Sequence, residues 1–328
     1  MKSHRNLWDQ FISKENFAFA VKRALRHKKK TAEIRRFLEN ADEMTERLRM
    51  AVLGGQFTTS KYRVKTIYEP KKREIYILPF YPDRIVHHAL MNVLIPIWDR
   101  MFIDDSFACR PKKGIHSASQ RCMRFVRRNK YVLQCDVRKF YPSIDHRVLM
   151  DIISHKIKDK KLVGLIENIV GSVEGDTNLP IGNFCSQWFG NLYLHELDLF
   201  VKHELRARDY LRYCDDFCLF SDSKRELGRH LAKIRSFLAD KLRLTFSLAE
   251  ISTVGNGVDF LGYRHFPDCV RMRKSTFERI TRRLGRILAV PAALRAADNR
   301  IMGQIGSMHG WLKHARNDFG DVRVMLLG

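Results

Sequence analysis

The chain has 328 residues, of which 45% are hydrophobic and 11% aromatic, enough for the cores of one to three domains. Its 60 Lys and Arg against 36 acidic residues give a net charge of +24, which favours a nucleic-acid partner over a solvated basic surface or membrane-surface binding. Seven cysteines without a C-x-x-C pair argue against a zinc site or a disulfide framework. We expect a cytoplasmic protein without a membrane span or signal peptide.

The N-terminal third is predicted to be helical around one hairpin. Residues 1–56 carry apolar residues at helical spacing, and HKKKTAEIRR between them reads as a solvated helix face or a phosphate contact. Residues 57–80 are β-branched and aromatic, which predicts two strands with cations at the turn Pro70-Lys71-Lys72. A helix is expected again over 83–102.

The remainder mixes strands and helices. A strand is expected over 130–137, a glycine turn leading into a long helix over 179–205, and a strand pair over 210–220. The segments 257–266 and 270–274 predict a further hairpin, followed by basic helices. Runs of strands and helices without strict alternation predict an α+β fold with an antiparallel sheet.

Three aspartates are the candidate catalytic residues. Asp136 ends the strand LQCDV, and Asp215 and Asp216 lie in the turn of YCDDF. If the two segments are neighbours in one sheet, Asp136 and Asp215 would share a face and could hold two magnesium ions for phosphoryl transfer. The alternative is surface turn residues or ion pairs with Arg208 and Arg212.

The ordered motifs resemble those of reverse transcriptases. CDVRKFYPSID is similar to the family's first catalytic block, LPIGNFCSQ to its template and nucleotide block, YCDD to its Y-x-D-D block and FLGYR to its primer grip. The resemblance covers roughly residues 60–275 in the family's order. It implies an RNA-directed DNA polymerase, a nucleotidyltransferase that takes template RNA, an RNA–DNA hybrid and dNTPs.

The resemblance implies roles for the candidate residues. Asp136 and Asp215 would ligate both Mg²⁺ ions, for which Mn²⁺ could substitute, and Asp216 would be a weaker third ligand. Tyr141 matches the steric gate against a ribose 2′-hydroxyl, unless it is an ordinary core tyrosine. The primer grip would be Phe260, Leu261 and Gly262, unless they are plain hairpin packing.

The resemblance also implies a nucleotide site. Lys71 and Arg73 would grip the triphosphate, with a solvated hairpin tip as the alternative. Arg110 is a candidate phosphate contact or a structural ion pair. The Gly182 backbone could approach a nucleotide closely because it lacks a Cβ. The remaining candidates of the nucleotide block are Ile181 and Gln187.

The architecture implied is a right-hand polymerase with fingers, a palm built on an antiparallel sheet and a small helical thumb. We expect an N-terminal helical segment at 1–56, fingers with interleaved palm at 57–130 and 155–205, palm with primer grip at 131–154 and 206–268, and a thumb at 269–328.

The block Ile181-Gly182-x-x-x-Ser186-Gln187 resembles that of diversity-generating retroelements, which are bacterial or phage-encoded. That subtype implies error-prone, adenine-directed cDNA made from a template-repeat RNA for mutagenic retrohoming. It also implies a small, basic, oligomeric accessory protein, the accessory variability determinant. The alternatives are a retron or phage-defence reverse transcriptase without adenine mutagenesis, and an RNA-binding scaffold without catalysis.

Overall fold

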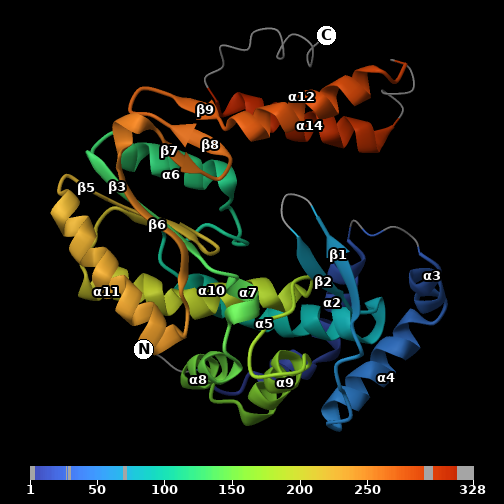
Figure 1. Cartoon of the computed structure of the whole chain (residues 1–328). Coiled ribbons are helices and arrows are strands. Elements are labelled where there is room, and N and C mark those ends of the chain that lie inside the picture. The colour runs from blue at the N-terminus through green and yellow to red at the C-terminus, as the bar shows by residue number, and fades with distance from the viewer. Residues whose placement is uncertain (1–3, 27, 29–30, 69–71, 292–297, 316–328) are drawn as a thin grey trace. The chain divides into compact units, whose positions relative to one another are not determined.

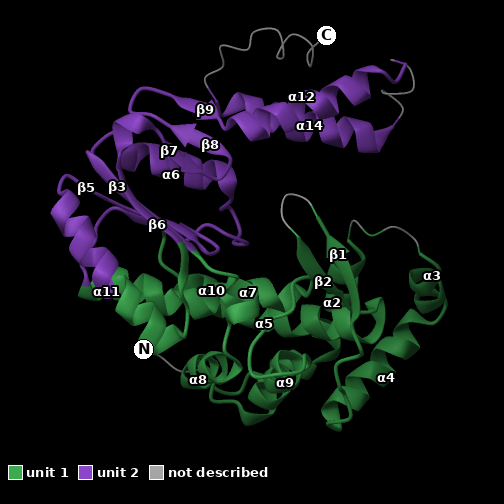
Figure 2. Cartoon of the chain, in the orientation of Figure 1, with its two compact units in different colours: residues 1–104, 137–204, 234–247 green, residues 105–136, 205–233, 248–328 purple. Residues whose placement is uncertain are grey.

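The computed structural model describes residues 4–26, 28, 31–68, 72–291 and 298–315 (Figure 1). The chain forms two compact units, each assembled from stretches that are far apart in the sequence (Figure 2). Unit 1 comprises residues 1–104, 137–204 and 234–247, and unit 2 comprises residues 105–136, 205–233 and 248–328. The division into fingers, palm and thumb stays a prediction.

The helical elements in chain order are α1 (Trp8–Ile12), α2 (Lys14–Leu25), α3 (Ala32–Glu39), α4 (Ala41–Leu53), η1 (Phe80–Arg84), α5 (Ile85–Met101), α6 (Ile115–Val126), α7 (Phe140–Ser143), α8 (His146–Lys156), α9 (Lys160–Val170), α10 (Phe184–Leu199), η2 (Phe200–Glu204), α11 (Lys224–Leu242), η3 (Val254–Asn256), α12 (Lys274–Leu288) and α14 (Asn299–Lys313).

The strands are β1 (Arg63–Ile67), β2 (Arg73–Ile77), β3 (Tyr131–Val137), β4 (Tyr210–Tyr213), β5 (Asp216–Ser221), β6 (Phe246–Thr253), β7 (Val258–Phe260), β8 (Tyr263–His265) and β9 (Val270–Met272). They form a two-stranded sheet β1-β2, a four-stranded sheet in the order β4-β5-β3-β6, and a three-stranded sheet β7-β8-β9. The mixed helix and sheet composition and the antiparallel pairing of β5 with β3 and β4 confirm the α+β class.

Unit 1 is built around two helices that are buried on most of their surface. α5 and α10 are rich in large apolar residues, and α10 buries side chains around most of its circumference. Capping aspartates fix where the neighbouring helices begin. Asp145 accepts from the Val148 amide at 3.0 Å to start α8, and Asp159 accepts from the Leu162 amide at 3.3 Å to start α9.

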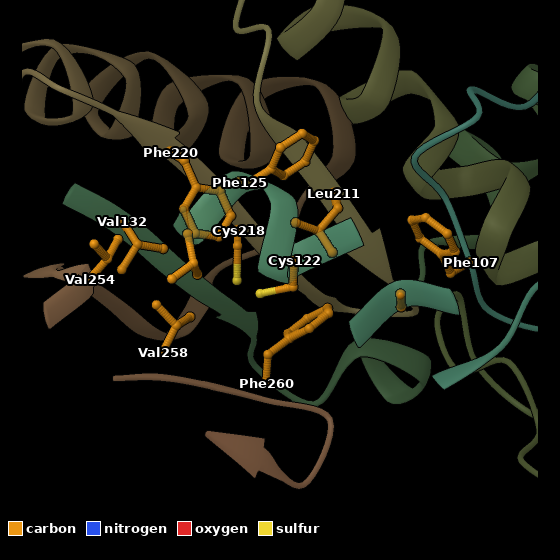
Figure 3. Packing of buried hydrophobic residues seen from close by; sticks show 12 residues of the cluster. Phe107, Cys122, Phe125, Val132, Leu211, Cys218, Phe220, Val254, Val258 and Phe260 are labelled. Carbon is orange, nitrogen blue, oxygen red and sulfur yellow. The ribbon is translucent and has the colours of Figure 1, made fainter. Parts of the chain in front are cut away.

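Unit 2 has a core shared by α6, the central sheet and β7. Figure 3 shows apolar side chains from each element meeting there, with the sulfurs of Cys122 on α6 and Cys218 on β5 turned toward one another. Val132 of β3 and Phe260 of β7 belong to the same cluster. A second cluster joins Tyr263 of the small sheet to apolar residues of α12 and α14. Both sheets of unit 2 are therefore anchored on helices.

Most expected elements are present. The strands predicted in 57–80, at 130–137, in 210–220 and in the hairpin segments all form, and the turn expected at Pro70-Lys71-Lys72 falls largely on residues outside those described. β6 was not predicted. Among the residues that the structure describes, no helix is long and apolar enough to cross a membrane.

Candidate active site

Two of the predicted carboxylates face each other across neighbouring strands. β3 and β5 are antiparallel, and Asp136 lies directly opposite Asp216. Directly opposed Cβ atoms in such a pair are about 4.5–5.5 Å apart and lie on the same face. That face also carries Val132 and Cys218, which belong to the buried cluster. The two half-buried carboxylates therefore stand where an apolar strip of the sheet ends.

The third carboxylate lies in the adjoining turn. Tyr213 of β4 pairs with Asp216 of β5, so Cys214 and Asp215 form a two-residue turn between the strands. Cys214 adopts φ +56°, in the left-handed region. Arg212, whose side chain is fully buried, donates from Nη1 to the Cys214 carbonyl at 3.0 Å. A buried guanidinium thus fixes the backbone immediately before Asp215.

The negative charges perturb one another. Burial, the charge of Asp215, a hydrogen bond with Asp136 and the charge of Asp136 raise the pKa of Asp216 above its usual value, and Arg273 opposes this. Like charges so close disfavour simultaneous ionisation of the three carboxyl groups. A nearby cation would therefore stabilise their ionised forms.

The donor set suits a hard divalent cation. Carboxylate oxygens are the ligands that Mg²⁺ prefers, and Mg²⁺ is usually held by one or two carboxylates while substrate phosphates and waters complete its shell. Among the described residues, no group of three or more His, Cys, Asp or Glu side chains could by itself hold a metal ion. The facing carboxylates of Asp136 and Asp216 fit a cation whose shell would be completed by substrate phosphates and waters. The assignment of Asp136 and Asp215 as main ligands, with Asp216 weaker, stays a prediction.

The predicted primer-grip residues form a second tight turn in unit 2. Phe260 pairs with Tyr263, and the two residues between them have positive φ, +53° for Leu261 and +80° for Gly262. Positive φ at both central positions defines a type I′ turn, whose twist matches that of paired strands. A Cβ on Gly262 would lie 3.0 Å from the Trp311 ring. The side chain of Phe260 belongs to the buried cluster, and the partly buried Leu261 packs against it. The role of this turn as a primer grip stays a prediction.

Three polar residues in unit 2 extend the site beyond those found from the sequence. Arg273 donates from Nε to Asp259 Oδ1 at 2.7 Å, and its charge lowers the pKa of Asp216. Gln134 donates from Nε2 to the Asp259 carbonyl at 2.8 Å. Gln134 and Asp136 lie two residues apart and therefore share one face of β3. This spacing is the only sequence signal that could have pointed to Gln134.

In unit 1, the candidate steric gate is half-buried next to a glycine. Tyr141 lies in α7, five residues after Asp136 in the sequence. A Cβ on Gly190 of α10 would lie 3.1 Å from the Phe140 ring and 3.2 Å from the Tyr141 ring. Gly190 therefore gives α10 room to pack closely against both aromatic rings. The role of Tyr141 as a gate stays a prediction.

The nucleotide block packs against the basic hairpin of unit 1. Tyr76 of β2 donates its amide to the Ile181 carbonyl at 2.7 Å. Gly182 has φ +126°, and a Cβ there would lie 2.4 Å from the Tyr76 carbonyl oxygen. Glycine is thus required for the approach of β2. The nucleotide contact predicted for Gly182 remains a separate expectation.

The other predicted residues are distributed between the units. Arg73 is exposed at the start of β2, and Gln187 is exposed on α10, both in unit 1. Arg110 in unit 2 donates from Nη1 to the Ser106 carbonyl at 2.9 Å, a structural contact. Lys71 lies outside the described residues. The three carboxylates, Arg110 and the β7–β8 turn with the predicted primer-grip residues thus belong to unit 2. The other described candidates belong to unit 1.

Comparison with known proteins identifies the class. Residues 69–265 match the model of the family described as reverse transcriptase (RNA-dependent DNA polymerase). The chain belongs to this family, because the match covers more than half of its length and includes all three aspartates. The enzyme class predicted from the sequence is confirmed.

Individual relatives agree with the family. Protein YkfC of Escherichia coli (strain K12) is 25% identical over 267 residues, which cover 66% of this chain and 70% of that protein. The group II intron-encoded protein LtrA of Lactococcus lactis subsp. cremoris is 30% identical over 132 residues, or 38% of this chain and 22% of LtrA. Nuclear intron maturase 1 of Arabidopsis thaliana is 29% identical over 113 residues, 33% of this chain and 14% of that protein. The match to the two intron proteins therefore spans only a small part of their lengths.

Proposed function

We propose that the chain copies RNA into DNA with Asp136, Asp215 and Asp216 as its catalytic carboxylates. The observation that carries the proposal is the register of β3 and β5, which sets Asp136 opposite Asp216 with Asp215 in the adjoining turn. The family match over residues 69–265 supports the same reaction.

The chemistry follows from the carboxylates. Divalent cations held by Asp136, Asp215 and Asp216 would activate the primer 3′-hydroxyl and stabilise the leaving pyrophosphate oxygen. The protein's own contribution is to position the reacting groups and to neutralise charge. The buried Arg212 holds the turn, and Arg273 offsets part of the negative charge near Asp216.

The unit 1 candidates would select and hold the nucleotide. Arg73, exposed on β2, would contact the triphosphate, because a guanidinium suits bidentate phosphate contacts. Tyr141 would exclude the ribose 2′-hydroxyl. Ile181 offers shape without a directional hydrogen bond, and each such bond contributes about 0.5–1.5 kcal/mol net. A smaller energy difference between right and wrong pairs would lower fidelity.

The right-hand architecture is part of the proposal. α12 and α14 would form the thumb and follow the backbone of an A-like hybrid by its phosphates. Ile280, Leu284 and Ile287 of α12 are buried in a cluster shared with α14, whereas the cations of α12 are exposed. The exposed cations of α12 are Lys274, Arg279, Arg282, Arg283 and Arg286.

We further infer a diversity-generating retroelement enzyme. The support is the block Ile181-Gly182-x-x-x-Ser186-Gln187, whose Ser186 is buried in α10. The cDNA would then carry errors opposite template adenines, and a small basic accessory protein would assist. The cations would be two Mg²⁺ ions, with Mn²⁺ as a substitute.

Primer extension followed by cDNA sequencing tests both levels. Purified protein would be given an adenine-containing RNA template, a primer, four dNTPs and Mg²⁺ or Mn²⁺, with and without the accessory protein. We expect metal-dependent cDNA with errors concentrated opposite adenines. Accurate cDNA would keep the polymerase and shift the subtype to a retron or phage-defence enzyme. No metal-dependent cDNA under any of these conditions would contradict the polymerase.

An Ile181→Gln variant separates the fidelity argument from the subtype. The added amide can donate and accept hydrogen bonds, so we expect fewer errors at a similar extension rate. An unchanged error frequency would rule out a fidelity role for Ile181 and leave the polymerase assignment intact.

A further inference from the structure

Two arginines of the α6 region in unit 2 are committed to ion pairs. Arg121 donates from Nε to Asp105 Oδ1 at 2.6 Å. Arg128, just beyond the end of α6, donates from Nε to Asp209 Oδ2 at 2.6 Å. Both carboxylates are buried, so these arginines tie α6 to the segments that flank β4.

Two further arginines of the same region line a cavity instead. Arg124 and Arg127 are exposed and border a cavity of about 260 Å³, which we call the α6 cavity. No acidic residue is among the described side chains that line it. Arg127 makes one long hydrogen bond, from Nε to the Pro267 carbonyl at 3.4 Å. The full lining is Ser119, Gln120, Met123, Arg124, Arg127, Val270 and His314.

The wall of the α6 cavity is ordered by contacts within unit 2. The His314 ring stacks on His116 with centroids 3.9 Å apart and planes at 16°. His116 in turn lies within hydrogen-bond distance of the Tyr263 hydroxyl, 3.3 Å from Nδ1. The buried Ser119 hydroxyl bonds to His265 Nε2 at 2.8 Å. Two exposed cationic residues thus line a cavity whose other walls are held by contacts within unit 2.

We propose that the α6 cavity binds a backbone phosphate of structured RNA, outside the template–primer duplex. Guanidinium groups match phosphate oxygens bidentately, and the two arginines have no carboxylate in the cavity to offset their charge. A water molecule takes about 30 Å³, so the cavity has room for a phosphate and part of its ribose. RNA is the favoured source because the chain belongs to a family that uses RNA templates and carries a net charge of +24. The choice of RNA rests on the proposed function.

The test compares two double variants in the full-length chain. Arg124→Gln with Arg127→Gln removes the cavity cations, and Arg225→Gln with Arg229→Gln removes two exposed cations of α11. The first measurement is the affinity for a long structured RNA between about 50 and 200 mM salt. The second is primer extension on a short unstructured template. A DNA of the same sequence serves as the competing ligand.

We expect the cavity variant to bind structured RNA about tenfold more weakly. The salt slope, which is the slope of the logarithm of the binding constant against the logarithm of the salt concentration, should be smaller in magnitude by about one to two. The α11 variant should keep the slope of the unmodified protein. Extension on the short template should be the same in all three proteins. Unchanged extension on the short template shows that the cavity variant is folded. Arg124→Lys with Arg127→Lys keeps the charge and should restore binding in part.

Several results would overturn the proposal. These are an unchanged RNA affinity and slope in the cavity variant, an equal loss in the α11 variant, or equal competition by DNA. Loss of short-template extension in the cavity variant would place the arginines in the template–primer path and overturn it as well. Failure of the proposed polymerase function is distinguishable, because the unmodified protein would then extend no primer.

Discussion

Two tight turns of unit 2 invite comparison, because both join antiparallel strands through two residues. The β4–β5 turn contains Cys214 and Asp215, and the β7–β8 turn contains Leu261 and Gly262. Each has backbone in the left-handed region. Such turns impose register on their strands, and in the first of them the register decides where Asp216 lies.

The two turns are held by different forces. The β4–β5 turn is anchored by charge, through the buried Arg212 guanidinium on the Cys214 carbonyl. The β7–β8 turn is held by shape, because Gly262 leaves no Cβ between the turn and the Trp311 ring. The β4–β5 turn places Asp215 directly before Asp216 of β5 and needs an electrostatic anchor against their repulsion, whereas the uncharged β7–β8 turn needs only room to pack.

The largest effect is expected from removing a facing carboxylate. Asp136→Asn should lower the rate of primer extension at least about 100-fold, because one charge that holds the catalytic cations is lost. The free energy of unfolding in metal-free buffer should be unchanged or higher, since like-charge repulsion is relieved. The measurements are initial rates and urea unfolding, with Asp240→Asn on the exposed face of α11 as control. Extension within a few-fold of the unmodified rate would contradict the assignment.

The β7–β8 hairpin should be sensitive to acid. Burial lowers the pKa of His265 to about 4, while the ring bonds to Ser119 and to the Val258 carbonyl. Its stabilising contribution is complete above the unfolded pKa of about 6.5 and is lost as pH falls toward 4, by up to about 3 kcal/mol.

Urea unfolding at pH 7 and pH 5 measures this loss. His265→Gln keeps a donor and an acceptor but does not titrate, so it should flatten the pH dependence. Part of the dependence should remain, because burial also lowers the pKa of His87 to about 3 and of His88 to about 4. An identical pH dependence in the variant would show that His265 contributes nothing to it.

Arg212→Met tests the electrostatic anchor. It leaves the Cys214 carbonyl without its guanidinium donor, which should lower the free energy of unfolding by about 1–3 kcal/mol and slow primer extension. Arg212→Lys should recover part of both. Arg229→Met on the exposed face of α11 is the matched control and should change neither. Equal stability of the Arg212 and Arg229 variants would remove the proposed contrast between the turns.

Gly262→Ala tests the shape-held turn and should have the smallest effect. The alanine would have to adopt φ +80°, and its Cβ would lie 3.0 Å from the Trp311 ring. Together these should lower the free energy of unfolding by about 1–2 kcal/mol. The matched control is Gly285→Ala on α12, where a Cβ meets nothing within 4 Å. That change should stabilise by up to about 1 kcal/mol. The same sign for both substitutions would refute the steric argument.

Local patterns were enough to predict most of the strands but not their register. The apolar runs around Asp136 and Asp215 indicate strands, and the α+β class follows from their order. The register that sets Asp216 opposite Asp136 depends on pairing between segments far apart in the chain, which spacing alone does not reveal. β6 escaped prediction because none of its residues is fully buried and its burial pattern does not alternate cleanly.

The candidate site was predictable to a similar degree. The carboxylates stand out because adjacent acids are costly in a strand turn, and the family motifs locate them. Arg212 and Gly182 owe their structural roles to contacts made only in the folded chain, with the Cys214 carbonyl and the Tyr76 backbone respectively. A sequence shows a buried arginine and a surface arginine as the same letter.

The most direct test of the central claim is single-turnover primer extension on an RNA template, comparing the unmodified chain with Asp215→Asn across a Mg²⁺ titration. We predict Mg²⁺-dependent cDNA synthesis by the unmodified chain and a loss of at least about 100-fold in the variant at every Mg²⁺ concentration. Synthesis by Asp215→Asn at the unmodified rate would contradict the claim that the carboxylates of β3 and the β4–β5 turn form the catalytic centre.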